Sequence, residues 1–143
     1  MEAFGEPEKV YVEMDWYDGP RSGVADVNGV PHYLVSFFDE DDNDFSIFTI
    51  WTIKQELFDL EIEQWQIFVE WNDLYESGRS AVDSHPAHGG INKRYDEIET
   101  HLKPHREKIP VSARRAKAKF ERINRAERYC TSGPDYLFRW HVM

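Results

Sequence analysis

The chain lacks most features that assign a sequence to a specialised class of protein. It has 143 residues and a single cysteine, Cys130, so no disulfide bond can form within it. Its most apolar stretch, residues 45–53, has half the length of a membrane-spanning helix and contains hydroxyl side chains. The first residues have neither the basic nor the apolar segment of a secretory signal. These absences predict a cytoplasmic protein that does not enter a membrane.

The sequence also lacks the short motifs that identify common enzymes and calcium-binding proteins. It contains no glycine-rich phosphate loop, no GxSxG nucleophile motif and no Cys-His arrangement. The acidic run at residues 39–44 begins like an EF-hand loop. However, Asp44 stands where that loop requires glycine, and Ile50 stands where it requires a carboxylate. We therefore interpret this run as a solvated loop between two strands.

Histidine spacing does not predict a zinc site. His85 and His88 lie in a polar loop, and His101 and His105 have the i, i+4 spacing of two ligands on one helix face. Pro104 disturbs that spacing, and there is no HExxH sequence. We expect no metal and no other cofactor.

The net charge of −10 conceals an uneven distribution along the chain. Residues 1–76 contain nineteen acidic and three basic residues, whereas residues 103–128 contain ten basic and three acidic residues. Net acidity argues against binding of nucleic acid or an anionic membrane by the whole surface, and only the basic segment remains a candidate. We favour docking of the basic segment onto acidic groups of the same molecule over nucleic-acid binding.

Alternation of apolar and polar side chains predicts several strands, which is the pattern of a sheet with one buried face. The pair Asn28-Gly29 readily adopts the positive φ angles of a type I′ turn, so it predicts a tight hairpin. The two most apolar segments are expected to be the central strands. The expected strands are residues 10–17, 24–27, 30–38, 45–53 and 136–140.

Helical spacing begins at residue 54 and indicates the strongest helix in the chain, which Gly78 ends. Thr52 and Gln55 form a candidate capping box at its start. Trp65 and Phe68 lie on its most apolar face and are predicted to contact the sheet. A second apolar face requires burial on two sides or a partner surface.

Two further helices are expected after this one. The first covers residues 95–102, and Lys103-Pro104 ends or kinks it. The second follows Pro110, with Ser112 as its N-cap and a narrow apolar stripe on one side. Basic residues in its first turn oppose the helix dipole, which predicts neutralising acidic groups or an external anion nearby. Its basic patch consists of Arg114, Arg115, Lys117, Lys119 and Arg122.

The strongest candidate for a polar site is the first turn together with the hairpin that follows it. Asp18, Arg21 and Ser22 can hold an anion through the guanidinium group and free turn amides, and His32 lies nearby in the sequence. Asp26 and His32 are not expected to pair, because a two-residue turn places them on opposite faces of the hairpin. We favour a structural role, in which Asp18 accepts turn N–H groups and Arg21 pairs with a carboxylate.

One part of the sequence resembles a known group of proteins. Residues 14–26, MDWYDGPRSGVAD, and residues 28–32, NGVPH, resemble the opening hairpin of small bacterial proteins whose activity is unknown. The resemblance covers less than a fifth of the chain. It implies no activity, cofactor or catalytic residue.

Together these patterns predict one α+β domain over residues 1–143. We expect a mainly antiparallel sheet of about five strands, four before and one after a block of three helices that packs on one face. We favour a cytoplasmic protein-interaction or regulatory module without catalysis of its own, whose partner is another protein or a second copy of the chain. One such module is an acidic protein that neutralises a basic partner.

Two other functions remain open from the sequence. The first is a small enzyme, or a domain that binds an anion or another ligand, built on the turn from Asp18 to Ser22 and on His32. The second is nucleic-acid binding through the basic segment at residues 103–128.

Overall fold

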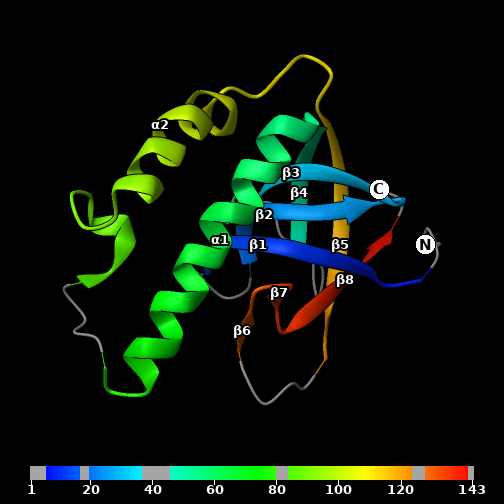
Figure 1. Cartoon of the computed structure of the whole chain (residues 1–143). Coiled ribbons are helices and arrows are strands. Elements are labelled where there is room, and N and C mark those ends of the chain that lie inside the picture. The colour runs from blue at the N-terminus through cyan, green and yellow to red at the C-terminus, as the bar shows by residue number, and fades with distance from the viewer. Residues whose placement is uncertain (1–5, 17–19, 37–45, 80–83, 124–127, 142–143) are drawn as a thin grey trace.

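The computed structural model describes residues 6–16, 20–36, 46–79, 84–123 and 128–141 (Figure 1). It confirms the α+β class. In chain order the elements are β1 (Glu8–Trp16), β2 (Pro20–Val27), β3 (Val30–Ser36), β4 (Ser46–Thr52), α1 (Gln55–Glu76), the 3₁₀ helix η3 (Pro86–His88), α2 (Lys93–Glu107), β5 (Arg114–Arg122), β6 (Tyr129–Cys130), β7 (Gly133–Pro134) and β8 (Tyr136–His141).

Six of these strands close into an antiparallel barrel in the order β1-β2-β3-β4-β5-β8. The first four strands form a meander, and β8 closes the barrel by pairing with both β5 and β1. β6 and β7 form a separate two-stranded ribbon. The prediction of an open sheet with about five strands is therefore wrong in its detail. Closure pairs both sides of every barrel strand, which removes the edges that an open sheet would leave.

The hairpin between β2 and β3 has the predicted turn. Asn28 and Gly29 have φ angles of 57° and 78°, and the register pairs Asp26 with Pro31 as expected. The Glu8 carboxylate accepts the N–H groups of Asn28 and Gly29 at 2.8 and 2.6 Å. The turn sequence thus sets the register locally, and the carboxylate from β1 satisfies the turn amides.

β1 changes the face that it presents to the barrel interior. Val10 pairs with Ala25 and packs inside the barrel, whereas Val12 pairs with Val24 and packs outside it. The register shift between the two valines is a bulge, which allows residues two apart to point to opposite faces. Gly23 lies against this bulge, where a Cβ atom would be 2.0 Å from the Val12 carbonyl oxygen. A side chain at this position would force β1 and β2 apart.

The barrel interior forms the first of two apolar cores. Phe138 packs between Phe48 and Trp140, with ring centroids 5.3 and 5.5 Å apart. The indole N–H of Trp140 donates to the Asp26 carbonyl oxygen at 2.8 Å. This core contains Val10, Ala25, Val27, Leu34, Phe48, Ile50, Ala116, Ala118, Tyr136, Phe138 and Trp140.

The second core lies outside the barrel, beneath α1. Trp65 and Val69 of this helix pack on Val12, Val24 and other outward-facing barrel residues. Both α-helices lie on the same side of the barrel, with α2 beside α1 (Figure 1). α1 thus contacts both the barrel and α2, and its buried residues are Glu61, Gln64, Trp65, Val69 and Asn72. In the part of the chain described here, no helix has the length and apolar character to cross a membrane.

α1 spans nearly the predicted range. Gly78 has a φ angle of 78° and follows the last helical turn, which confirms the predicted end. The predicted capping box of Thr52 and Gln55 is wrong, because the N-cap residue is Lys54 and no side chain caps the helix.

α2 continues through Pro104 to Glu107, so the helix does not end at Lys103-Pro104, which was one of the two predicted outcomes. Proline inside a helix removes one backbone hydrogen bond and disfavours the helical conformation of the preceding residue. The turn beyond it carries Arg106, which makes several hydrogen bonds to α1. These tertiary contacts compensate for the lost backbone bond.

The segment predicted as a third helix is the strand β5. Ala116, Ala118 and Phe120 point into the barrel, and Lys117 and Lys119 point outward. Small alanine side chains fit both a helical stripe and an alternating strand, so the local pattern was ambiguous. Hydrogen-bonded pairing with β4 on one side and β8 on the other makes this segment a strand. The helix-dipole argument for these basic residues no longer applies.

Trp65 should be a main anchor of α1 on the barrel. It is 4% exposed, and its indole N–H donates to the Cys130 carbonyl oxygen at 2.7 Å. Trp65→Ala is expected to lower the free energy of unfolding by about 3 to 5 kcal/mol. Leu74→Ala on the same helix, where the side chain is 39% exposed, is the control and should change it far less. Equal denaturant midpoints for the two variants would contradict this packing.

Candidate ligand-binding cavity

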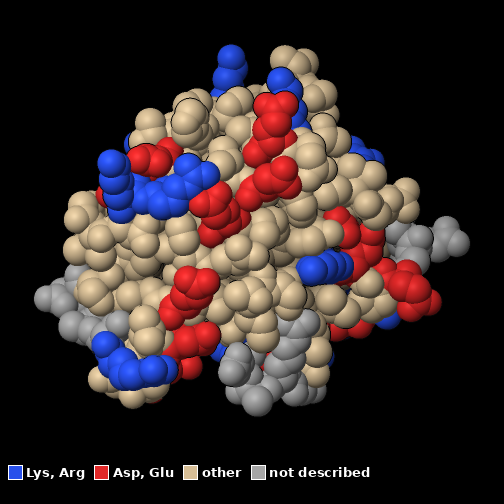
Figure 2. Space-filling view, in the orientation of Figure 1, with Lys and Arg blue, Asp and Glu red and all other residues tan. Residues whose placement is uncertain are grey.

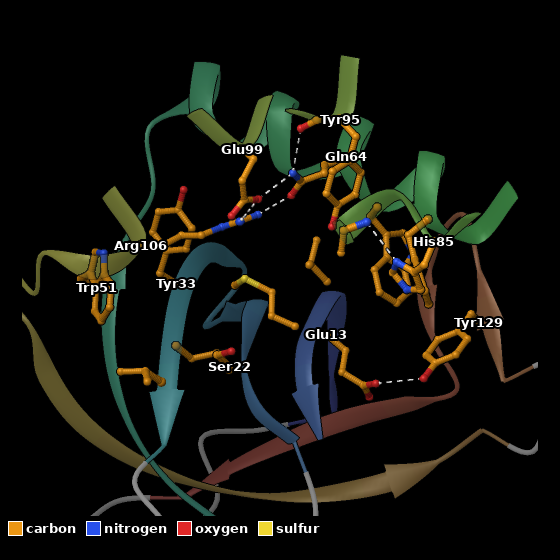
Figure 3. A pocket seen from close by; sticks show the side chains of 17 residues that line it. Glu13, Ser22, Tyr33, Trp51, Gln64, His85, Tyr95, Glu99, Arg106 and Tyr129 are labelled. Atoms are coloured by element: carbon orange, nitrogen blue, oxygen red, sulfur yellow. Dashed lines mark hydrogen bonds and ion pairs between the residues drawn. The ribbon is translucent and has the colours of Figure 1, made fainter. Parts of the chain in front are cut away.

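A cavity of about 620 Å³ lies between the outer face of the barrel and the two α-helices (Figure 3). Gln64, Tyr95 and Glu99 lie on its helical side, Glu13 and Tyr129 lie opposite, and His85 lies at one end. The volume is within the range of about 300 to 1,000 Å³ that small-molecule sites occupy. The helices therefore form a roof, and the strands form a wall.

A network of charged hydrogen bonds holds the roof together. The Arg106 guanidinium donates two hydrogen bonds to Glu61, at 2.6 and 2.9 Å. It also donates to Glu99 at 2.8 Å and to the Gln64 side-chain oxygen at 2.6 Å. The Gln64 amide in turn donates to Glu99 at 2.9 Å. α1 supplies Glu61 and Gln64, and α2 supplies Glu99 and Arg106, so the network joins the two helices.

Burial makes this network sensitive to the loss of any charged member. The Glu61 side chain is fully buried, and the Arg106 side chain is 14% exposed. Burial alone would lower the pKa of Arg106, but the hydrogen bonds and negative charge of Glu61 raise it above its ordinary value. Because Arg106 stays charged, both carboxylates share one cation.

The hydroxyl group of Tyr33 lies next to this network. Tyr33 is 2% exposed, and its hydroxyl oxygen is buried. Burial, the negative charge of Glu61 and a hydrogen bond to Glu61 raise the pKa of Tyr33, so the phenol remains protonated. In Figure 3 Tyr33 lies beside Arg106 at the cavity wall.

Aromatic rings form the opposite end of the cavity. Trp65 and Phe68 of α1 pack on Tyr129, with ring centroids 5.6 and 5.1 Å from it in edge-to-face geometry. The centroids of Trp65 and Phe68 are 5.4 Å apart. Trp65 and Phe68 also pack with outward-facing barrel residues such as Val12 and Val24, which confirms the predicted contact of these two side chains with the sheet.

Glu13 of β1 links the strand wall of the cavity to the C-terminal part of the chain through hydrogen bonds. Its carboxylate, whose side chain is 5% exposed, accepts hydrogen bonds of 2.7 Å from both Arg128 and the Tyr136 hydroxyl. The Tyr129 hydroxyl is 3.4 Å away. Burial and then the Glu13 charge raise the pKa of Tyr136, so the phenol remains a donor. Glu13 is thus a neutralised anion in the wall.

His85 has a defined tautomer at the end of the cavity. Its Nδ1 atom accepts the Ala87 backbone N–H at 3.0 Å, so the proton of the neutral ring is on Nε2. The ring packs on Trp71, with centroids 4.5 Å apart. Burial and then the neighbouring His88 lower the pKa of His85 below its ordinary value of 6.5. His85 is therefore neutral at physiological pH.

Three of the four predicted site residues lie within the described ranges, and Asp18 lies outside them. Arg21 is 8% exposed and donates to the Ser36 hydroxyl at 3.3 Å. His32 is 5% exposed, and its Nδ1 is 2.7 Å from the Val30 carbonyl oxygen. Of the four predicted residues, Ser22 lines the cavity.

The predicted basic patch lies on β5. Lys117 is opposite His141 and Lys119 is opposite Arg139 in the pairing of β5 with β8. Lys117 is 7% exposed, and Arg139 pairs with Glu121 of β5 at 2.7 Å. Arg114, Arg115 and Arg122 belong to the same strand and are exposed.

Two other arginines of the basic segment make internal ion pairs. Arg106 pairs with Glu61 at 2.6 Å, and Arg128 pairs with Glu13 at 2.7 Å. Both carboxylates come from the acidic first half of the chain. On the helical face, acidic side chains follow the course of α1 with basic groups beside them (Figure 2).

Within the described ranges, no group of three His, Cys, Asp or Glu side chains is arranged to hold a metal ion. The rings of His85 and His88 stack with centroids 5.6 Å apart. The acidic run at residues 39–44 lies outside these ranges.

The cavity residues were not identified from the sequence as a site. Glu61 had one local signal, because it is a carboxylate between Leu60 and Ile62 in a strongly apolar helix. Its partner Arg106 is 45 residues away, and no pattern links the two. Tyr33 resembled an ordinary core residue of an apolar strand.

No protein-family model matches this chain, and neither the curated proteins nor the solved structures contain a significant match. The function therefore has to be inferred from the chemistry of the cavity.

The roof network gives a direct test of stability. Arg106→Leu leaves Glu61 buried without its cation and should lower the free energy of unfolding by about 3 to 5 kcal/mol. The double variant Arg106→Leu with Glu61→Leu buries no charge at this contact and should recover much of that loss. Chemical denaturation of the wild type and both variants measures the difference. A double variant less stable than Arg106→Leu would contradict the assigned role of the ion pair.

His85 should make stability depend on pH. Because its pKa is lowered in the folded state, its contribution is complete above the ordinary value of 6.5 and is lost as the pH falls below that value. His85→Asn keeps an oxygen that can accept the Ala87 N–H but does not titrate. Between about pH 8 and about pH 5, the wild type should lose more thermal stability than this variant. An NMR titration that places the pKa of His85 above its ordinary value would contradict the assignment.

Proposed function

We propose that this protein binds a small organic molecule in the cavity between the barrel and the helices. The observation that carries the proposal is the cavity itself, which has a volume of about 620 Å³ and places the hydrogen-bonded Arg106, Gln64 and Glu99 among aromatic side chains.

The fixed polar groups of the helical side support the same proposal. Arg106, Gln64 and Glu99 are held by hydrogen bonds to one another, so a ligand meets polar groups that are already in position. Aromatic and aliphatic side chains supply the rest of the wall. A largely apolar cavity with a few fixed polar groups is typical of small-molecule sites.

This proposal takes up the ligand-binding alternative from the sequence and changes the location of the site. Ligand binding would stabilise the contact between the roof helices and the barrel, because the cavity lies between them. The molecule would then be a ligand-controlled module. Ser22 is the residue that this site shares with the first-turn site proposed from the sequence.

A thermal-shift screen of small organic compounds tests the proposal. It should yield compounds that stabilise the wild type, because a ligand that binds the folded state raises its thermal stability.

A pair of variants tests the location. Ala87 is exposed at the cavity lining, so Ala87→Trp should block the cavity and abolish stabilisation by the same compounds. Val111→Trp is the matched control, because Val111 is fully exposed and does not line the cavity. Compounds that stabilise all three proteins equally, or a screen without any stabilising compound, would refute the proposal.

A further inference from the structure

The groups that line the cavity carry a net negative charge. Glu13 and Glu99 are the acidic lining residues, and Arg106 is the basic one among the described residues that line it. Glu13 is neutralised by Arg128, which lies behind it. Arg106 forms ion pairs with both Glu99 and the fully buried Glu61, so one cation faces two carboxylates and one negative charge in the roof remains uncompensated.

Arg106 has little capacity left for an acidic ligand. Its guanidinium has five N–H groups, and four hydrogen bonds to Glu61, Glu99 and Gln64 already use four of them. A ligand carboxylate or phosphate would have to compete with these bonds. It would also bring negative charge next to two carboxylates.

Glu99 can accept a further hydrogen bond. Its Oε2 atom accepts from both Arg106 and Gln64, whereas no described residue donates to Oε1. The Glu99 side chain is 44% exposed, and it lies on the helical side of the cavity (Figure 3). The negative charge of the roof is therefore accessible from the cavity.

The rings around the cavity favour positive charge as well. Aromatic faces carry negative electrostatic potential and attract ammonium groups, most strongly where water is excluded. The aromatic residues that line the cavity are Tyr33, Trp51, Trp65, Phe68, Tyr95 and Tyr129.

We infer that the cavity selects an organic cation, an amine with an aromatic or alkyl body, over neutral and acidic molecules of the same shape. This inference rests on the proposed function and adds the class of ligand. The ammonium group lies near Glu99 and donates to its Oε1 atom, while the body packs on the aromatic wall.

Three probes with one naphthyl body separate charge from shape. These are 2-(1-naphthyl)ethylamine, 2-(1-naphthyl)ethanol and 1-naphthylacetate, which are cationic, neutral and anionic at neutral pH. Isothermal titration calorimetry of the wild type should show the amine binding at least about tenfold more tightly than the alcohol. The acetate should bind more weakly than the alcohol.

Two variants of α2 test the role of Glu99. Glu99→Gln removes the uncompensated charge and should reduce amine affinity about tenfold while leaving alcohol affinity unchanged. Glu107→Gln makes the same charge change at an exposed position outside the cavity lining and should alter neither affinity. Denaturation curves of both variants establish that they are folded.

The outcomes separate this inference from the proposed function. If the alcohol or the acetate binds as tightly as the amine, and Ala87→Trp abolishes that binding, the selection for cations is overturned and the cavity remains a ligand site. The same holds if Glu99→Gln leaves amine affinity unchanged. If none of the three probes binds, the inference is overturned, and the proposed function is then judged by the compound screen alone.

Discussion

The ion pair between Arg106 and Glu61 is the contact on which the roof of the cavity depends. A fully buried carboxylate is tolerated only with a cation and enough donors, and the Arg106 guanidinium supplies both. The pair also holds the last turn of α2, beyond Pro104, against α1. Together with the fully buried Ile98 and Leu102, this charged contact fixes the position of α2 and thus the helical side of the cavity.

The barrel supplies the rigid counterpart of that roof. Its interior is filled with its own core, so the outer face is free to pack against α1 and to line the cavity. The bulge in β1 connects the two roles, because it directs Val10 inward and Val12 outward. Ligand-contacting groups on strands and helices are positioned more precisely than groups on loops.

The uneven charge of the chain reappears as tertiary structure in two places. Arg128 from the basic segment neutralises Glu13 in the strand wall of the cavity, and Arg106 from the same segment neutralises Glu61 in the roof. The two ion pairs differ in net charge, because Arg106 in the roof also faces a second carboxylate, Glu99, whereas the pair of Arg128 with Glu13 has no second carboxylate among the described residues. That difference creates the negative side of the cavity.

Local sequence patterns determined the α+β class, the Asn28-Gly29 hairpin and its register, the main helix and the place of Trp65 on it. These features depend on neighbouring residues, through turn geometry and side-chain periodicity. Only the tertiary structure decided that β5 is a strand, because Ala116 and Ala118 fit either periodicity until β4 and β8 pair with them. It alone closed the barrel and joined Arg106 to Glu61, since contacts between residues far apart in the chain leave no local pattern.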